Sequence, residues 1–331
     1  MDSVKDSHSS ESEVQQGTPT RTDSPDVDIN SVLHLLISRS GVQQKIHIKD
    51  VNKTEKLIEK IISTGPDSLQ VIADFDATLS CYHSAGKKCE TSYGVIQNSR
   101  LTPEDVKVRG AELFKTYHPI EIDSSISAEE KALKMVEWYE RKHDNYVTSS
   151  KKLKSADITE MVKEAHLNLR DGCGKVLDKL QSANIPTLVF SAGSGNVVEE
   201  VLRMQKKLHP NTKVISNFME FDDETTELAR FRKPVVHPGN KNEAALHGDN
   251  AKYFEELKNR NNVILLGDTI GDTNMASGVS NPDAILKIGY LNFNFELQLE
   301  SFKDAFDIVL VDDQTVYFVD ALLDLVLKPS L

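Results

Sequence analysis

The chain has 331 residues, of which 39% are hydrophobic and 27% are charged, a composition typical of a globular protein with about two domains. Its 51 acidic and 39 basic side chains give a net charge of −12, which argues against a protein that mainly binds nucleic-acid polymers. Its three cysteines form no CxxC pair, which favours free thiols in a reducing compartment. No apolar stretch is long enough to span a bilayer and no secretory signal is recognisable, so we expect a cytoplasmic protein without a membrane partner.

The N-terminal part is predicted to contain a disordered tail, a helix and a strand. Residues 1–28 are rich in Ser, Asp and Thr and nearly free of large apolar residues, so they bury too little surface to fold. Apolar residues at helical spacing predict a helix over about residues 52–62, which Gly65 and Pro66 then end. The apolar run at 69–73 predicts a buried strand.

The segment at 82–167 is predicted to be a block of charged helices. Thr102 and Ser127 are residue types that cap helix N-termini, and each precedes an acidic first turn. From there to the C-terminus, helices alternate with strands, which indicates crossover connections and a parallel sheet. We therefore predict an α/β fold in which residues 29–81 and 168–331 form a Rossmann-like parallel sheet core and residues 82–167 form an inserted helical cap domain.

Acidic and hydroxyl side chains follow the predicted strands at their carboxyl ends, where open parallel sheets bind ligands. The set comprises Asp74 and Asp76 after the first strand, Ser191 after the next, Asp268 and Asp272 after a later one, and Lys241 at the start of a helical segment between them. Taken singly, such residues are common in turns, helix caps and on surfaces. Their shared position at one sheet edge predicts a functional site.

The acids of this set match the ligands that Mg²⁺ prefers, which are oxygens from one or two carboxylates together with a substrate phosphate. Asp74 and Asp268 can bind the ion directly, and a backbone carbonyl near Asp76 and water can complete its shell. Asp272 can orient one of these waters.

The two acids of the first strand end are suited to different steps of phosphoryl transfer. Asp74 can attack phosphorus as a carboxylate nucleophile, and Asp76 can protonate the leaving oxygen and later accept a proton from water. The Ser191 hydroxyl, the N–H groups of its loop and Lys241 can stabilise the phosphoryl oxygens.

These motifs resemble the four motifs of the haloacid dehalogenase-like superfamily: DFDATLS at 74–80, the apolar run into Ser191, Lys241 and GDTIGD at 267–272. The superfamily's dehalogenases lack the second acid, because a halide needs no proton, so its presence implies a phosphatase or phosphotransferase. The segments SAGSGNVVEEV, VISNFMEFD, EEKALKMVEWY, LLGDTIGDTNMASGV and ILKIGYLN are similar to the cytosolic type III 5'-nucleotidases. That group comprises pyrimidine 5'-nucleotidases and 7-methylguanosine phosphate-specific nucleotidases.

The resemblance covers roughly residues 42–330 and implies Mg²⁺-dependent hydrolysis of nucleoside 5'-monophosphates such as CMP, UMP or 7-methyl-GMP. It places the nucleophile on Asp74, the acid/base on Asp76, metal ligands on Asp74, Asp268 and the Asp76 carbonyl, phosphate contacts on Ser191, Ala192 and Lys241, and a nucleoside-binding cap acid on Glu121. One departure is visible after Val-Glu-Trp-Tyr, where the family reads Thr-Lys-Ser-His. This chain has Glu-Arg-Lys-His there, so Lys142 stands where the family has a substrate-contacting serine.

Aromatic side chains are candidates for a base-stacking slot, since a cap closes over the phosphate site. Tyr82 follows the catalytic loop, and Tyr139 is a second candidate, whereas Trp138 lies on a periodic apolar face and is better explained as a core residue.

Two alternatives to the nucleotidase remain open. One is another phosphatase of the superfamily, acting on a phosphoserine or a sugar phosphate. The other is a non-enzymatic phospho-acceptor of the receiver type, although such domains have no second acid and no large cap. In the favoured interpretation the substrate is the only partner, and we expect the protein to be a monomer.

Overall fold

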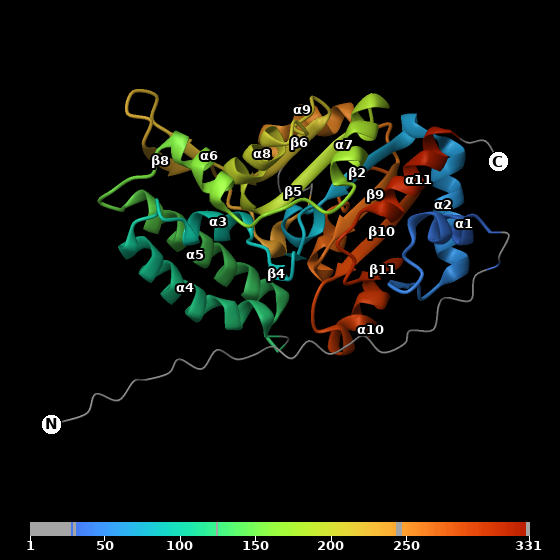
Figure 1. The fold of residues 1–331 in the computed structure, drawn as a ribbon, viewed down its shortest axis with the longest axis horizontal. Helices are drawn as coiled ribbons and strands as arrows, with labels where there is room; N and C mark the ends of the chain where they lie inside the picture. Colours follow the sequence, from blue (N-terminus) through green and yellow to red (C-terminus); the bar gives the residue numbers. More distant parts are fainter. Residues whose placement is uncertain (1–27, 29–30, 124, 243–246, 329–331) are drawn as a thin grey trace.

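The computed structural model describes residues 28, 31–123, 125–242 and 247–328. The tail expected at 1–28 therefore lies outside the described residues, apart from Asp28. At the centre of the described part is a seven-stranded sheet with the strand order β1-β11-β10-β9-β2-β5-β6 (Figure 1). Strand β1 pairs antiparallel with β11, and the other pairs are parallel, as the alternation of helices and strands predicts.

The strands of this sheet are short and mostly buried. Their bounds are β1 Ile46–His47, β2 Leu69–Ala73, β5 Thr187–Ser194, β6 Thr212–Asn217, β9 Asn262–Gly267, β10 Ala284–Leu291 and β11 Ile308–Val311. Every residue of β2 and β9 is buried, which is expected for central parallel strands that helices cover on both faces.

Helices pack on both faces of the sheet. The helices that contribute to the larger apolar cluster include α1 Val32–Ser40, α2 Val51–Thr64, α7 Cys173–Ser182, α8 Gly195–Met204 and α11 Tyr317–Leu327. Those of the second cluster are α9 His247–Glu256 and α10 Phe295–Ala305. Helix α2 confirms the helix predicted over 52–62, and it begins after Asp50, whose side chain accepts from the Lys53 N–H.

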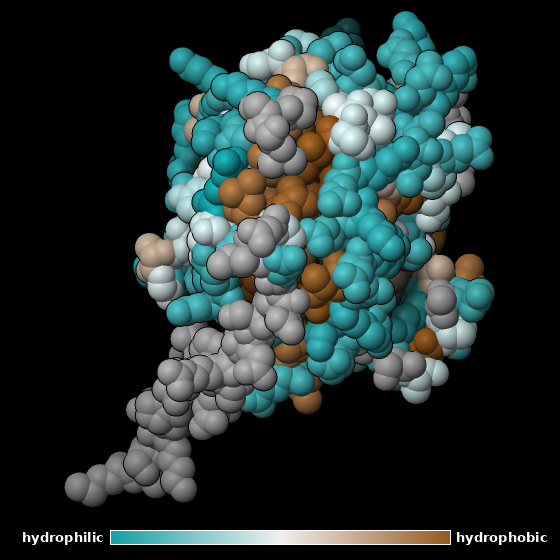
Figure 2. Space-filling model, turned by 90° about the vertical axis from the view of Figure 1, so that its right-hand side faces the viewer, coloured by the Kyte–Doolittle hydropathy of each residue, from teal (hydrophilic) through white to brown (hydrophobic). Residues whose placement is uncertain are grey.

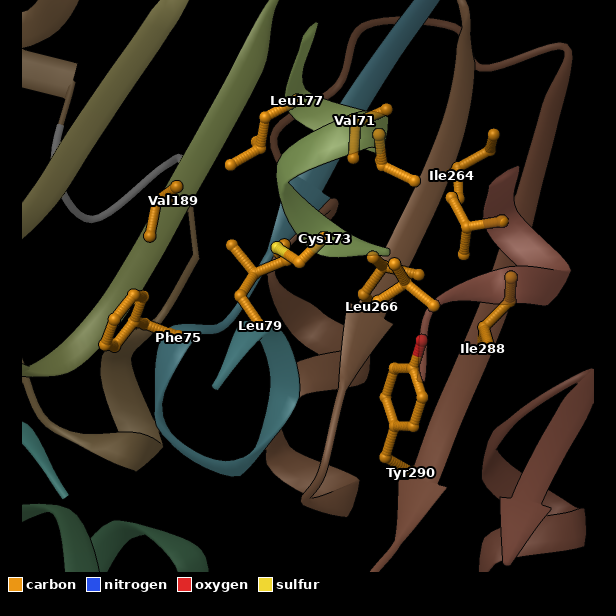
Figure 3. Packing of buried hydrophobic residues seen from close by; sticks show 14 of the residues in the cluster. Val71, Phe75, Leu79, Cys173, Leu177, Val189, Ile264, Leu266, Ile288 and Tyr290 are labelled. Carbon is orange, nitrogen blue, oxygen red and sulfur yellow. The ribbon is translucent and has the colours of Figure 1, made fainter. Parts of the chain in front are cut away.

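Side chains of each strand alternate between the two faces. In β2, Val71 and Ala73 belong to the larger cluster and Ile72 to the second one. Figure 3 shows Leu177 and Cys173 of α7 among the side chains of the larger cluster. Because alternate residues are buried on opposite faces, a shift of one residue in β2 would also displace the acids that follow it.

The helices that lie beyond one end of the sheet belong mostly to the connection from β2 to β5 (Figure 1). Before it reaches α7 of the core, this connection contains β3 His83–Ser84, β4 Lys87–Lys88, α3 Ser92–Asn98, α4 Glu104–Ile122, α5 Ala128–Val147 and α6 Ser155–Glu164. Helices α4 and α5 pack against each other, and α6 packs on α8 of the core. That residues 82–167 form a separate cap domain stays a prediction.

The two predicted helix caps in this connection have different outcomes. Ser127 is confirmed, because its hydroxyl accepts from the Glu130 N–H at 3.2 Å. The cap predicted at Thr102 is wrong, because α4 begins one residue later than expected and Pro103 is its N-cap. The Thr102 hydroxyl instead donates to the Ile96 carbonyl.

The surface of the described residues is largely hydrophilic. Figure 2 shows one face on which polar residues surround a smaller apolar area. Within the described ranges, no helix combines the length and hydrophobicity needed to cross a bilayer. A second hairpin, β7 Met219–Phe221 with β8 Leu228–Phe231, follows β6 and was not predicted.

Candidate active site

The loop at 74–80, directly after β2, turns its two carboxylates toward different partners. Ala77 takes a left-handed conformation with φ +57°, and its N–H donates to the Ser80 hydroxyl at 2.9 Å. Asp74 contacts Lys241, whereas Asp76 contacts Ser92 at the start of α3. The different roles predicted for Asp74 and Asp76 therefore have a structural counterpart.

Asp74 forms a buried ion pair. Its Oδ1 lies 2.5 Å from Lys241 Nζ, and these two residues are only 4% and 5% exposed. The same ammonium lies 2.9 Å from Asp272 Oδ1. Burial raises the pKa of Asp74, and Lys241 opposes this shift. Burial lowers the pKa of Lys241, but the Asp272 and Asp74 carboxylates outweigh it, so the ammonium stays charged.

Lys241 does not begin a helix as expected. It follows the 3₁₀ turn at Pro238–Asn240 and is itself not helical, while residues 243–246 of the expected helical segment lie outside the described residues. The prediction of its place between the strand-end motifs is nevertheless confirmed by its contacts with Asp74 and Asp272.

Three carboxylates from two strand ends gather beside this lysine. One oxygen from each of Asp74, Asp268 and Asp272 lies within 4.8 Å of the others. Burial and the neighbouring carboxylates raise the pKa of Asp268 well above its usual value. A set of carboxylate oxygens at this spacing suits a hard divalent cation, so the donor chemistry fits the predicted Mg²⁺.

Asp272 is the most constrained of the three acids. Its Oδ2 accepts from the Asp268 N–H at 3.2 Å, the Thr269 N–H at 2.9 Å and the Thr269 hydroxyl at 2.8 Å. Its Oδ1 accepts from Lys241. Both of its oxygens are therefore engaged within the protein, and its predicted role in orienting a water stays a prediction.

Asp76 is held by a residue that the sequence did not single out. The Ser92 N–H donates to Asp76 Oδ1 at 2.7 Å, and the Ser92 hydroxyl donates to Oδ2 at 2.6 Å. The same hydroxyl accepts from the Ser194 N–H at 3.1 Å. Burial raises the pKa of Asp76, and the two bonds from Ser92 lower it. Its carboxylate is not part of the three-acid group, so a metal contact from Asp76 rests on its backbone carbonyl.

The C-terminal part of β5, where its pairing with β6 is irregular, brings the predicted phosphate contacts beside these acids. The buried Ser191 hydroxyl accepts from the Gly193 N–H at 3.0 Å. A Cβ added to Gly193 would lie 1.9 Å from Ser92 Oγ and 2.7 Å from Asp76 Oδ2, which shows how closely this backbone approaches Asp76. The Ala192 carbonyl accepts from the Asn217 side chain at 2.8 Å.

Arg170 supports the 74–80 loop by donating to its carbonyl groups, and the sequence did not single it out either. It is 1% exposed, its Nε donates to the Thr78 carbonyl at 2.7 Å, and its guanidinium also donates to the Ala77 carbonyl. The guanidinium lies 4.0 Å from the ring centre of Tyr290. No spacing pattern marks this arginine, because its partners are backbone carbonyls more than 90 residues away.

An aromatic cluster of Tyr93, Tyr117, Trp138 and Tyr139 lies on α3, α4 and α5, and Ala192 packs against it. Trp138 is 5% exposed, which confirms its core position, and its ring stacks on Tyr117 at 6.0 Å. Tyr82 is not a member of this cluster, and a base-stacking slot that includes it stays a prediction.

Tyr82 has other ring partners. Its ring stacks on that of Phe293 at a centroid distance of 5.5 Å and meets the ring of His83 edge-on. Whether Tyr82 contacts a substrate stays a prediction. A nucleoside contact from Glu121, near the end of α4, also stays a prediction. Burial raises the pKa of Glu121, and His118 and Lys142 oppose this shift.

The sequence matches the family described as pyrimidine 5'-nucleotidase (UMPH-1) over residues 77–327. The chain belongs to this pyrimidine 5'-nucleotidase family. Its members are phosphoric monoester hydrolases, and the match confirms the predicted resemblance.

Relatives in the family match almost end to end. The 7-methylguanosine phosphate-specific 5'-nucleotidase of Gallus gallus is 40% identical over 285 residues, which are 86% of this chain and 97% of that protein. The protein of the same name from Drosophila melanogaster is 37% identical over 287 residues, 86% of this chain and 88% of its own length.

Solved structures confirm the fold. Cytosolic 5'-nucleotidase IIIB bound to cytidine superimposes with a TM-score of 0.81 at 36% identity, covering 88% of this chain and 97% of that one. A haloacid dehalogenase-family hydrolase from Salmonella enterica serovar Typhi has a TM-score of 0.50 at 11% identity, over 79% of this chain and 73% of its own. At that identity the second likeness concerns the fold alone, and it agrees with the predicted haloacid dehalogenase-like core.

Proposed function

We propose that this chain is a Mg²⁺-dependent 5'-nucleotidase that hydrolyses nucleoside 5'-monophosphates through a phosphoaspartate on Asp74. The observation that carries the proposal is the separation of two acids of one loop. Asp74 is paired with Lys241 beside further carboxylates, whereas Asp76 is held apart by Ser92. A nucleophile and an acid/base need such different surroundings.

The reaction divides between these two acids. A carboxylate oxygen of Asp74 attacks phosphorus, and the bond from phosphorus to the nucleoside 5'-oxygen breaks. Asp76 donates a proton to that leaving oxygen. Asp76 then accepts a proton from the water that attacks the phosphoaspartate, which releases phosphate and restores Asp74. Lys241, Ser191 and the N–H of Ala192 stabilise the phosphoryl oxygens.

Charge balance favours a dication at this site. Three carboxylates (Asp74, Asp268 and Asp272) face one ammonium (Lys241), which leaves an excess of two negative charges among buried groups. We assign Asp74, Asp268 and the Asp76 carbonyl as ligands of Mg²⁺. When bound, the ion supplies positive charge against the phosphoryl oxygens.

The nucleoside part of the substrate is supported by the names of the relatives and by the aromatic cluster. The relatives are named for 7-methylguanosine phosphate, and the similar solved structure is bound to cytidine. The cluster packs against Ala192, so aromatic rings adjoin the predicted phosphate contacts. We assign Glu121 as a nucleoside contact on the same side, and we expect a cytoplasmic monomer.

Steady-state kinetics on CMP, UMP, 7-methyl-GMP, AMP and p-nitrophenyl phosphate tests the proposal. We expect at least one nucleotide to exceed the baseless ester in kcat/KM, and EDTA to abolish turnover until Mg²⁺ is restored. Asp74→Asn should reduce activity to background, and Asp76→Asn should lower kcat about 10²- to 10⁴-fold in a folded protein. Preference for the baseless ester would instead favour a different phosphatase of the superfamily.

A further inference from the structure

The side chain of Lys142 lies inside the aromatic cluster. Its ammonium is 3.9 Å from the ring centre of Tyr93, 4.7 Å from that of Tyr139 and 5.2 Å from that of Trp138. Rings at these distances attract a cation through their electron-rich faces. The cluster is therefore an aromatic cage whose occupant is a cation of the chain itself.

The ammonium of Lys142 lacks an acceptor. In the part of the chain that the structure describes, it forms neither a hydrogen bond nor an ion pair, although the side chain is partly buried. An ammonium has three N–H donors, and ring faces satisfy them less well than oxygen does. Burial accordingly lowers the pKa of Lys142 to about 8, and Glu121 and Asp76 oppose the shift.

The position of Lys142 relates it to the reaction. It is close enough to Asp76 and to Glu121 for each carboxylate to act on its charge. Tyr93, one of its rings, directly follows Ser92, which holds Asp76. Ala192, next to the predicted phosphate-binding hydroxyl, packs on the same cluster. The unpaired donors thus lie on the side of the phosphate site where the nucleoside of a bound monophosphate is expected.

We propose that Lys142 is a specificity-determining residue that favours nucleoside monophosphates with an uncharged, carbonyl-bearing base, such as UMP and CMP, over 7-methyl-GMP. The proposal rests on the nucleotidase function inferred above. It sets this chain apart from its relatives of about 40% identity, which are named for 7-methylguanosine phosphate.

Two physical effects act in the same direction. N7-methylation gives guanine a formal positive charge, and aromatic cages bind such cations well. Here the cage already holds an attached cation, which competes at a high effective concentration and repels a second positive charge. A uracil or cytosine carbonyl can accept from the unpaired N–H groups of Lys142 without bringing a positive charge, and a hydrogen bond to a charged donor is stronger than a neutral one. 7-Methylguanine also has a carbonyl acceptor, so it is the charge that separates the two kinds of base.

The test compares kcat/KM for UMP, CMP and 7-methyl-GMP in the full-length Mg²⁺-loaded protein and in Lys142→Met, Lys142→Arg and Lys134→Met. Rates of each variant are divided by its own rate on p-nitrophenyl phosphate, and circular dichroism checks folding. We expect the wild type to prefer the pyrimidine nucleotides. Lys142→Met should shift the ratio of UMP to 7-methyl-GMP at least roughly tenfold toward 7-methyl-GMP, mainly through KM.

The remaining variants are the controls. Lys142→Arg keeps the charge and should retain the pyrimidine preference. Lys134→Met removes an exposed lysine of the same helix, paired with Glu137 at 3.2 Å, and should leave the ratio unchanged. A wild type that prefers 7-methyl-GMP, or an unchanged ratio in Lys142→Met, would overturn the proposal while the nucleotidase function stands. If no nucleotide exceeds p-nitrophenyl phosphate, both proposals fail together, and the wild-type panel alone reveals it.

Discussion

Replacing Ser92 by Ala isolates the contribution of one hydroxyl to the proposed acid/base. The hydroxyl donates to Asp76 Oδ2 at 2.6 Å and accepts from the Ser194 N–H at 3.1 Å, so its loss leaves two polar groups without that partner. The backbone N–H, 2.7 Å from Asp76 Oδ1, remains. The helix start also remains, because the Thr91 side chain accepts from the Gly94 N–H at 3.0 Å. The substitution therefore changes Asp76 with little effect on α3.

The expected size follows from the chemistry of the lost bond. A hydrogen bond to a charged group contributes about 1.5–3 kcal/mol, equivalent to roughly a ten- to hundredfold decrease in kcat if it acts fully in the transition state. The direction in which the pKa of Asp76 changes also follows from the structure. Burial raises the pKa of Asp76 and Ser92 lowers it, so deleting the Ser92 hydroxyl raises this pKa further. Asp76 then stays protonated to higher pH.

This shift has a distinct kinetic signature. The first step needs protonated Asp76, so the alkaline limb of kcat/KM should move to higher pH. The hydrolysis step needs the Asp76 carboxylate, so the acidic limb of kcat should move in the same direction when that step limits turnover. The measurement is a pH profile of both kcat and kcat/KM, from initial rates over a range of nucleotide concentrations at constant Mg²⁺. Ser63→Ala, the same substitution at an exposed site on α2, is the matched control. A folded Ser92→Ala with wild-type kcat and unmoved limbs would refute the role assigned to Asp76.

Three further substitutions test the surroundings of the site. Gly193→Ala places a methyl group 1.9 Å from Ser92 Oγ, so we expect kcat to fall about a hundredfold or more, with a smaller effect on the melting temperature. Steady-state kinetics measures the first effect and thermal denaturation the second. Arg170→Met removes buried donors from two loop carbonyls and should lower the free energy of unfolding by about 3 kcal/mol in urea titrations, in addition to reducing activity; unchanged stability would contradict its supporting role. Lys241→Met removes the ammonium that opposes the raised pKa of Asp74 and that we assign to the phosphoryl oxygens, so kcat should fall and saturating Mg²⁺ should not restore it.

The fold was predictable where a pattern extends over several residues. The helical spacing that predicted 52–62 reappears as α2, and the apolar run at 69–73 is β2. The elements that escaped prediction are short or depend on distant partners. Strand β1 has two residues and exists because Ile46 and His47 pair with β11, more than 260 residues later. Local sequence does not encode such a pairing.

The site was predictable for residues that directly follow strands. Parallel strands end at a common edge, so Asp74, Asp268 and Asp272 meet there as the sequence indicates. Ser92 instead begins α3, and Arg170 lies in the segment between α6 and α7, so both reach the site only through the tertiary fold. The stacking of Tyr82 on Phe293, more than 200 residues later, likewise could not be read from its nearness to Asp76 in sequence.

The reacting acids and the aromatic cluster belong to different parts of the fold, and both contact α3. The reacting acids belong to strand ends, whereas the aromatic cluster belongs mainly to α4 and α5. A change confined to the cluster, such as a substitution of Lys142, can alter which base binds without moving the pair of Asp74 and Lys241. Adjacent residues of α3 nevertheless contact both parts, since Ser92 holds Asp76 and Tyr93 faces Lys142. A base that displaces Tyr93 therefore also displaces Ser92, and base selection should appear in kcat as well as in KM for poorly fitting nucleotides.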